Sequence, residues 1–547
     1  MSLTPDSRQK IDDIRNYLFG GGYPDPVNNA EQLAFLFYFY LAETLDIQSA
    51  ARARVLKQTY QSPYADEWTL LNPLNAASFG GLAVIPRERF RWSQWAKALS
   101  GENLVRFVRD EVFPFFTEIA GNSAMNFMDG ARLGIDEPTV LTQVINKVDE
   151  LRLDSSDADT KGDLFEHVLR QIKQAGELGQ FRTPRHVIRA IVAIINPQVG
   201  EIIYDPAAGT AGFLAAAYDY IKLNNSSEHA IETSELDGKL VKRGQGDKLS
   251  APQWLTLQER TFFGNDVDPK MVRLATMNLT LRGLSAVKVL KRNALTTTLD
   301  NEQKRALGLP IEGYHVILAN PPFSGRVDKD RIVDEVKIGT STATELLFLK
   351  YMMDSLRPNG RCGVIVPEGV LFGSTSSHKE LRRQLIENNT VEAILSLPGG
   401  VFQPYAGVKT SVLIFKQGGS TEKVMFLNVE NDGYKLDANH DMPIYADDFP
   451  ALVHSYHARD ERWVEWLSWQ SAKVQNQDEV WQQNWWFADT TTLRAKDFNL
   501  SAGGYRPLNQ AAVEHRNPRE LLSELAAIEA EIAEEVEALQ IALLGDA

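Results

Sequence analysis

The residues best suited to chemistry are Asn320-Pro321-Pro322-Phe323, which follow the apolar segment HVILA at 315–319. Two consecutive prolines make a stiff turn without backbone donors, and they leave the Asn320 side-chain oxygen and the Pro321 carbonyl as two acceptors. Such a pair can accept both hydrogens of a planar exocyclic amino group, which frees the nitrogen lone pair for attack. The Phe323 ring can stack on the heterocycle. An Asn-Pro-Pro turn also occurs by chance in ordinary loops.

The segment DPAAGTAGF at 205–213 has the composition of a ligand-binding turn, because small residues follow a predicted strand and open an apolar helix. Such residues let a ligand approach the backbone and the helix N-terminus closely. The segment lacks the middle glycine of G-x-G-x-x-G, which disfavours a nicotinamide cofactor. An ordinary tight turn is the alternative.

Asp266 ends another predicted strand, in the segment GNDVDP at 264–269. A carboxylate at this place can accept hydrogen bonds from both ribose hydroxyls of an adenosyl group, although an aspartate before a helix is equally often its N-cap. The spacing from Gly212 to Asp266 far exceeds the ~20 residues usual for a dinucleotide-binding unit. We therefore expect an insertion around 224–258.

Apolar periodicity divides the 547 residues into three predicted regions, since one core stops growing at roughly 250–300 residues. Helical spacing predicts an N-terminal helical domain over 1–155, with a β-like interruption near 81–86. Strands alternating with helices then predict an α/β catalytic domain over 156–435, built on a Rossmann-like doubly wound sheet. Its strands are expected at 201–205, 261–266, 287–293, 315–320, 360–367, 390–398 and 410–417, with a further candidate at 423–429.

The C-terminal region, 436–547, gives weaker signals. Six of the ten tryptophans fall between Trp463 and Trp486, and packing in a core or on a partner is favoured over stacking on bases. An apolar stripe from Leu521 to Leu543, with steps of three or four residues, predicts a long acidic helix over 518–544. That helix should pack on another helix, within this chain or on a partner.

Composition excludes several classes of protein. The chain is 44% apolar and 24% charged, which is typical of globular proteins. Its single cysteine, Cys362, excludes an internal disulfide and a cysteine-rich metal centre, and the first ten residues lack the pattern of a signal peptide. We therefore expect a cytoplasmic protein without a membrane role. The net charge of −15 argues against binding nucleic acid through a global positive field, so a basic partner would have to assist.

Four segments in order, Phe181-Arg182-Thr183-Pro184, DPAAGTAGF, GNDVDP and Asn320-Pro321-Pro322-Phe323, resemble those of S-adenosylmethionine-dependent methyltransferases that act on amino groups of DNA. Within them, the chain resembles the modification subunits of type I restriction-modification systems over roughly residues 5–435. The resemblance implies a methyltransferase sheet that binds S-adenosylmethionine. The implied function is methylation of adenine N6 in double-stranded DNA, at a site chosen by a separate specificity subunit.

The resemblance also assigns expected roles to individual residues. The turn at 320–323, with Pro322 included, would be catalytic. The methionine part of the cofactor would lie against the segment around 181–184, and its ribose against Asp266. The residues expected to bind the cofactor are Phe181, Thr183, Pro184, Asp205, Ala207, Gly209, Gly212, Asp266, Val267 and Asn293.

Two parts of this assignment carry alternatives. Asn293 stands where the family usually has an aspartate beside the adenine ring, so that hydrogen bond depends on an amide oxygen. Phe402, Tyr405 and Lys409 lie in the segment that resembles the second wall of the target-base pocket, but aromatic core packing is an equal alternative. No metal site is expected.

The implied reaction is an in-line displacement, in which the amino nitrogen of an extruded base attacks the sulfonium methyl group without a covalent enzyme intermediate. The expected partners are double-stranded DNA, a specificity subunit, a second modification subunit and, in a complete restriction enzyme, a translocating restriction subunit, since this chain lacks a phosphate-binding P-loop motif. The alternatives are cytosine-N4 methylation, methylation of a protein glutamine amide, and an inactive cofactor-binding scaffold.

Overall fold

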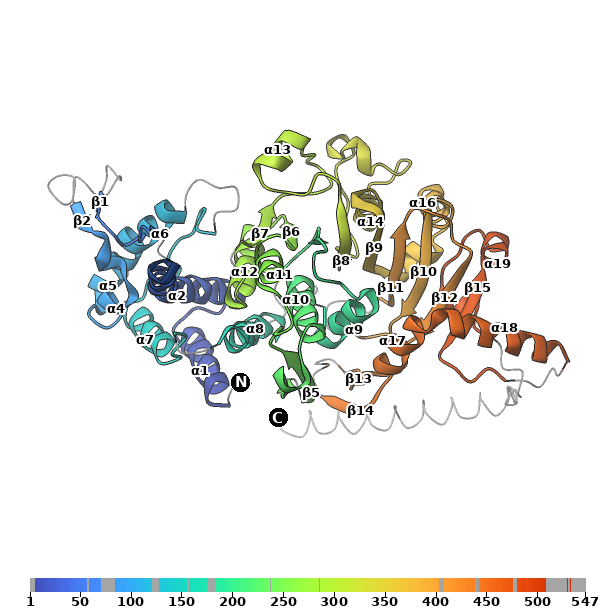
Figure 1. Ribbon diagram of the computed structural model, residues 1–547, viewed down its shortest axis with the longest axis horizontal. Helices are drawn as coiled ribbons and strands as arrows, with labels where there is room; N and C mark the ends of the chain where they lie inside the picture. Colours follow the sequence, from blue (N-terminus) through green and yellow to red (C-terminus); the bar gives the residue numbers. More distant parts are fainter. Residues whose placement is uncertain are drawn as a thin grey trace, which may run out of the picture.

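The computed structural model describes residues 5–56, 59–69, 84–120, 127–154, 157–174, 183–236, 238–284, 286–402, 408–437, 440, 442–475, 480–507, 529 and 532. Its centre is a nine-stranded sheet in the spatial order β15-β12-β10-β11-β9-β8-β3-β6-β7 (Figure 1). The inner strands are near-continuous apolar runs, as expected of a sheet covered on both faces. The strands are β3 (Ile203–Asp205), β6 (Phe262–Asp266), β7 (Lys288–Lys291), β8 (Tyr314–Ala319), β9 (Leu356–Pro367), β10 (Asn389–Ser396), β11 (Thr410–Gln417), β12 (Lys423–Asn428) and β15 (Trp485–Asp489).

The first strand of this sheet in the chain is β3, which lies inside the sheet, and later strands are added on both sides of it. β3 pairs in parallel with β6 on one side and with β8 on the other, and the parallel pairing continues to β7 and β9. β11 then runs antiparallel between β9 and β10. The strand order therefore reverses between β3 and β8, which is where open α/β sheets bind their ligands. All seven predicted strands and the candidate at 423–429 are confirmed.

Helices cover both faces of the sheet. α10 (Gly212–Asn224) and α12 (Pro269–Leu281) connect strands toward β7, whereas α14 (Thr344–Ser355) and α16 (Ser376–Asn388) connect strands in the opposite direction. Because crossovers between parallel strands are right-handed, the two pairs lie on opposite faces. α9 (Arg185–Ile195) packs beside α10. The shorter helices of this region are α11 (Ala251–Glu259), α13 (Asn301–Ala306) and α15 (Glu368–Phe372).

The predicted insertion before β6 is confirmed. Between α10 and α11 the chain forms an antiparallel hairpin of β4 (Ile231–Leu236) and β5 (Lys239–Gly244). The Lys239 ammonium lies 2.6 Å from Asp447 Oδ2, so the hairpin is joined to the C-terminal region. β5 and β14 (Pro443–Asp447) lie side by side at the lower edge of Figure 1.

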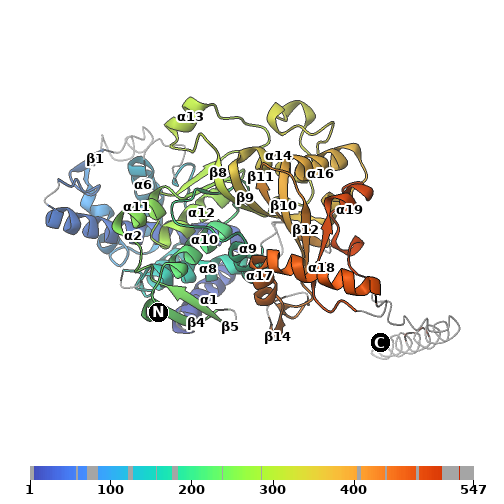
Figure 2. The ribbon, with the colours of Figure 1, turned by 45° about the vertical axis from the view of Figure 1, so that its right-hand side comes forward.

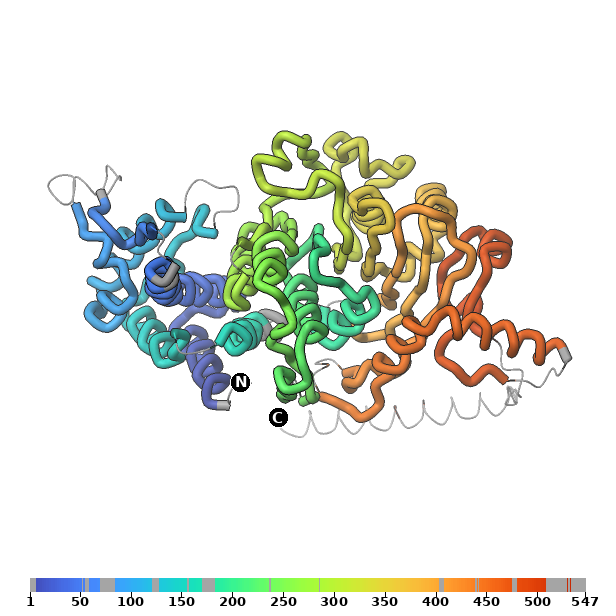
Figure 3. The backbone as a smooth tube through the Cα atoms, viewed as in Figure 1, coloured from blue at the N-terminus to red at the C-terminus, as the bar shows by residue number. Residues whose placement is uncertain are grey.

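The N-terminal helices lie at one end of the molecule (Figure 3). Their aromatic side chains build a second core. Phe39, for example, stacks on Phe116 with ring centroids 4.5 Å apart. The predicted β-like interruption is a two-stranded pairing of β1 (Glu67–Thr69) with β2 (Val84–Pro86). The helices are α1 (Pro5–Gly20), α2 (Pro26–Leu56), α4 (Trp92–Trp95), α5 (Gly101–Phe107), α6 (Phe113–Ala120), α7 (Pro138–Asp149) and α8 (Ala158–Gln174).

This second core includes side chains from both sides of the predicted boundary at residue 155. Phe165 of α8 is fully buried in it, and Met271 and Leu274 of α12 close it from the catalytic side. Arg273 of α12 pairs with Glu31 of α2 at 2.6 Å. The two regions therefore share an apolar interface, and the domain boundaries stay a prediction.

The C-terminal region extends the sheet and covers one end of it (Figure 2). Trp463 packs against Phe487, and Trp466 packs against Trp481, so the tryptophan cluster forms core rather than a surface for bases. β15, which carries Trp485 and pairs with β12, was not predicted. Of the helix predicted over 518–544, the structure describes only residues 529 and 532. The elements are β13 (Asp432–Tyr434), β14 (Pro443–Asp447), α17 (Phe449–His457), α18 (Arg459–Gln475) and α19 (Thr490–Ala495).

Candidate active site

Three of the predicted chemical segments meet at one edge of the sheet. Asp205 ends β3, Asp266 ends β6, and Asn320 follows β8. Because β3 lies between β6 and β8 and is parallel to both, the carboxyl ends of the three strands are neighbours. Segments more than a hundred residues apart in the sequence thus come together where the strand order reverses.

The Asn320 amide has a defined orientation. Its Nδ2 donates a hydrogen bond of 2.9 Å to Thr183 Oγ1, from the segment that leads into α9. Its Oδ1 is buried and has no hydrogen-bond partner among the described residues. A buried acceptor left unpaired costs about 1–3 kcal/mol, so this oxygen is suited to accept from a bound amino group.

The rest of the turn is rigid and partly covered. Pro321 is buried and Pro322 is exposed. The Phe323 ring is 7% exposed and meets the Phe402 ring edge to face, with centroids 5.2 Å apart and an interplanar angle of 88°. Phe402 is itself buried, so the aromatic packing that the sequence left open as an alternative does occur. The contact also brings Phe402, which precedes β11 in the chain, to the turn at 320–323.

Asp266 holds the small-residue turn in place. Its Oδ2 accepts from the Gly209 backbone N–H and its Oδ1 from that of Asp268, both at 2.9 Å. The N-cap of α12 is Asp268, whose side chain accepts from Lys270 N, so Asp266 is not the cap. Gly209 adopts a φ of +51°, a conformation that glycine reaches easily. Val267 is 59% exposed beside this carboxylate.

Asp205 is a second carboxylate in the same place, 2% exposed, and it accepts from Ala207 N at 3.0 Å. Burial, together with the nearby charge of Asp266, raises the pKa of Asp205 to about 8. Burial also raises the pKa of Asp266. Neither group forms an ion pair with Lys or Arg in the described part of the chain. Two such groups favour a cationic ligand, which would offset the cost of burying their charge.

The remaining predicted residues lie as follows. Pro184 precedes α9, and Gly212 begins α10. Asn293 follows β7, and its Oδ1 accepts from Leu295 N at 3.0 Å, which leaves one lone pair for a ligand. Lys409 is exposed just before β11. Phe181 and Tyr405 lie outside the described residues.

A partly buried polar network beside these strand ends was missed by the sequence analysis. The Tyr204 and Tyr351 hydroxyls are 3.0 Å apart, and Arg292 donates to Tyr351 at 2.6 Å. Asn265 also bonds to the Tyr204 hydroxyl. Tyr204, Asn265 and Arg292 each come one position before an expected cofactor residue. Tyr204 and Asn265 lie in strands, where side chains alternate between the two faces, so they point away from Asp205 and Asp266. That alternation was the signal available in the sequence.

The comparisons with known proteins agree with this geometry. The sequence model of the N-6 DNA Methylase family matches residues 156–513. The chain is 30% identical to the type I restriction enzyme EcoEI methylase subunit of Escherichia coli, over 82% of this chain and 84% of that protein. It is 28% identical to the EcoKI methylase subunit of Escherichia coli K12, over 65% of this chain and 64% of that one.

Two solved structures share the fold. One comes from work on complex assembly and conformational transition of the type I R-M system. It has a TM-score of 0.64 and 24% identity, and the alignment covers 100% of this chain and 100% of that one. The other, a modification subunit of a putative type I restriction enzyme from Vibrio vulnificus, has a TM-score of 0.62 and 20% identity over 94% of this chain and 99% of that one.

The chain belongs to the N-6 DNA methylase family. It is an S-adenosylmethionine-dependent DNA methyltransferase, with the mixed α/β sheet and helical N-terminal region predicted from its sequence. The buried Asp205, the half-buried Asp266 and the small-residue turn between them fit a cofactor that carries a positive sulfonium. Within the part of the chain that the structure describes, no helix combines the length and apolar composition needed to cross a bilayer.

Proposed function

We propose that this chain is the modification subunit of a type I restriction enzyme and methylates adenine N6 in double-stranded DNA. The observation that carries the proposal is the oriented Asn320 amide, whose buried oxygen accepts no hydrogen bond within the described residues. The type I names of its relatives support this class of enzyme. A cytoplasmic location is part of the same proposal.

In the proposed mechanism, Asn320 Oδ1 and the Pro321 carbonyl accept the two hydrogens of the target amino group. These bonds draw the nitrogen toward tetrahedral geometry and direct its lone pair at the methyl group. Thr183 keeps the amide oxygen, rather than its NH2 group, facing the base. Bound S-adenosylmethionine supplies an electrophilic methyl group, and the amino nitrogen loses one proton to solvent after the transfer. Positioning supplies the rate enhancement, with no covalent intermediate.

The carboxylates of Asp205 and Asp266 favour binding of the methyl donor over binding of its demethylated product. Asp205 and Asp266 lie where the methyl donor is expected, and the donor carries one more positive charge than the demethylated product. Their attraction therefore weakens once the methyl group has left. In this proposal Asp266 accepts from the ribose hydroxyls, and the exposed Val267 side chain lies against the adenine.

The choice of DNA sequence belongs to a partner in this proposal. The chain carries a net charge of −15, whereas binding to DNA phosphates needs Lys and Arg. A specificity subunit would supply much of that positive surface, with two modification subunits on one specificity subunit. The predicted C-terminal helix is the proposed docking element, and a restriction subunit would join the same assembly.

The experiment is to purify the chain with and without the specificity subunit encoded beside it, and to incubate each with DNA and the methyl donor. Digestion of the DNA to nucleosides and mass spectrometry should show N6-methyladenine at one sequence, and only with the specificity subunit. N4-methylcytosine would contradict the choice of base. Sequence-specific methylation by the chain alone would contradict the role of the partner. Cofactor binding without methyl transfer in the full assembly would favour the scaffold alternative.

A further inference from the structure

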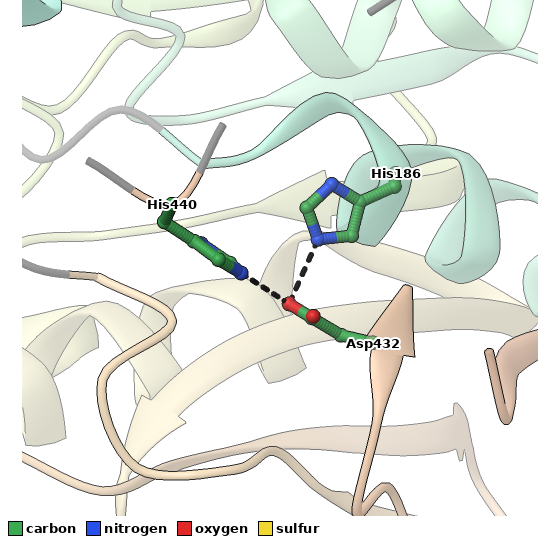
Figure 4. A group of neighbouring side chains, drawn as sticks. All are labelled: His186, Asp432 and His440. Carbon is green, nitrogen blue, oxygen red and sulfur yellow. Dashed lines mark hydrogen bonds and ion pairs between the residues drawn. The ribbon is translucent and has the colours of Figure 1, made fainter. Parts of the chain in front are cut away.

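Three side chains outside the active site converge on one point. His186 Nε2 lies 2.9 Å from Asp432 Oδ2, and His440 Nε2 lies 2.8 Å from the same oxygen (Figure 4). One ligand atom from each residue lies within 4.8 Å of the others. The side chains of Asp432 and His440 are 0% exposed and that of His186 is 10% exposed.

The fold brings these residues together from three places. His186 is the second residue of α9, Asp432 begins β13, and His440 lies in the connection between β13 and β14. The cluster therefore joins the start of α9 to the C-terminal hairpin. No sequence spacing could reveal it, because His186 and Asp432 are 246 positions apart.

Hydrogen bonding alone leaves this cluster incomplete. His440 Nδ1 is buried and has no hydrogen-bond partner among the described residues, and Nε2 approaches Asp432 without hydrogen-bond geometry. A buried imidazole usually donates from one ring nitrogen and accepts or ligates with the other. The contact between His440 Nε2 and Asp432 Oδ2 is therefore close without being a hydrogen bond, so both ring nitrogens of this buried imidazole lack a hydrogen-bond partner among the described residues.

We propose that His186, Asp432 and His440 bind one divalent transition-metal ion, with Zn²⁺ the best match. Two imidazole nitrogens and one carboxylate oxygen are ligands that Zn²⁺ prefers, whereas Mg²⁺ and Ca²⁺ prefer oxygen alone. Ligand atoms around tetrahedral Zn²⁺ lie roughly 3.3 Å apart for bonds of ~2.0 Å. The two N···O distances would therefore open by about half an ångström, and the two imidazole nitrogens, which lie within 4.8 Å of each other, would close toward the same spacing. A water molecule would complete the coordination.

The surroundings are those of a supported ligand set. The Tyr434 backbone N–H donates to Asp432 Oδ1 at 3.1 Å, which leaves Oδ2 for the ion. The Tyr434 ring stacks on the His186 imidazole, with centroids 4.4 Å apart. Hydrogen bonds to ligating side chains, such as the one from Tyr434 N–H, hold those side chains in place and raise metal affinity.

The ion acts as a clamp rather than as a catalyst. It fastens the β13–β14 hairpin to the first turn of α9, three residues after Thr183, which orients Asn320. The three ligating side chains are at most 10% exposed, so the site is almost closed to bulk solvent. Metal binding then stabilises the native fold by mass action, since the unfolded chain lacks the site.

The test uses the full chain, stripped with a chelator and dialysed. Calorimetric titration with Zn²⁺ should show one site per chain, and Co²⁺ in its place should give the visible absorption of a four-coordinate complex. Zn²⁺ should also raise the melting temperature. Mg²⁺ should neither bind in the titration nor raise the melting temperature. His440→Ala and Asp432→Asn should each weaken binding at least 100-fold. The matched control is His454→Ala, which removes an exposed histidine of α17 and should bind as the wild type does.

The proposal is overturned if the stripped wild-type chain binds neither ion at micromolar concentration, or if His440→Ala binds Zn²⁺ as tightly as the wild type. The wild-type titration decides the matter even if a variant fails to fold. These readouts need no methyl transfer, so they are independent of the proposed function.

Discussion

The hydrogen bond from Asn320 to Thr183 makes the most specific prediction about catalysis. Thr183→Val replaces the hydroxyl with a methyl group of similar size at a position 7% exposed, so packing is retained and only the acceptor is lost. Without it, the Asn320 amide can turn and present its NH2 group to the target base. A net hydrogen bond is worth about 0.5–1.5 kcal/mol, and each ~1.4 kcal/mol of barrier is a factor of ten in rate. We expect the methylation rate to fall roughly 3- to 10-fold.

The assay is single-turnover methylation with the specificity subunit present, together with the dissociation constant of the methyl donor. Thr183→Ser keeps the oxygen and should restore most of the rate. Thr256→Val is a control for loss of a threonine hydroxyl in a helix away from the site. The reasoning is refuted if Thr183→Val methylates at the wild-type rate, or if Thr183→Ser is equally slow. A weaker affinity for the donor with an unchanged rate would mean that Thr183 acts only on the cofactor.

Three further predictions concern the carboxylates and the aromatic contact. Asp266→Ala removes a charged acceptor for the ribose and should weaken donor binding roughly 10- to 100-fold by calorimetry; unchanged binding would contradict its role. The folded-state pKa of Asp205, about 8, lies above its unfolded value, so its stabilisation of the free protein is lost as pH rises toward 8. In urea unfolding, wild type should therefore lose stability relative to Asp205→Asn between about pH 5 and 8, and parallel curves would refute this. Phe402→Ala removes a buried ring and should destabilise the fold by about 3–5 kcal/mol, while Val408→Ala, at an exposed position nearby, should change little.

Much of the catalytic sheet could be predicted from the sequence, because its strands are continuous apolar runs bounded by turn residues. The position of Asp205, Asp266 and Asn320 also followed, since each ends or follows such a run and parallel strands place their carboxyl ends together. The insertion before β6 was predicted because the spacing from Gly212 to Asp266 is much longer than in a usual dinucleotide-binding unit. The edge strand β15 was missed because its tryptophans indicated a core cluster without indicating a strand.

What escaped prediction depends on contacts between distant segments. The Tyr204–Arg292 network lies away from the residues expected to bind the cofactor, so no motif includes it. The His186–Asp432–His440 cluster needs the packing of the C-terminal hairpin on α9. The shared core of α8 and α12 likewise depends on how two regions meet, which periodicity within either one does not specify.

The central claim is that Asn320 activates the target amino group, and single-turnover methylation by Asn320→Ala tests it most directly. The account predicts a rate at least 1,000-fold (about 4 kcal/mol) below wild type, with unchanged affinity for the methyl donor. Asn301→Ala, at an exposed position of α13, should methylate normally. An Asn320→Ala enzyme that transfers methyl groups at a rate near wild type would contradict the account.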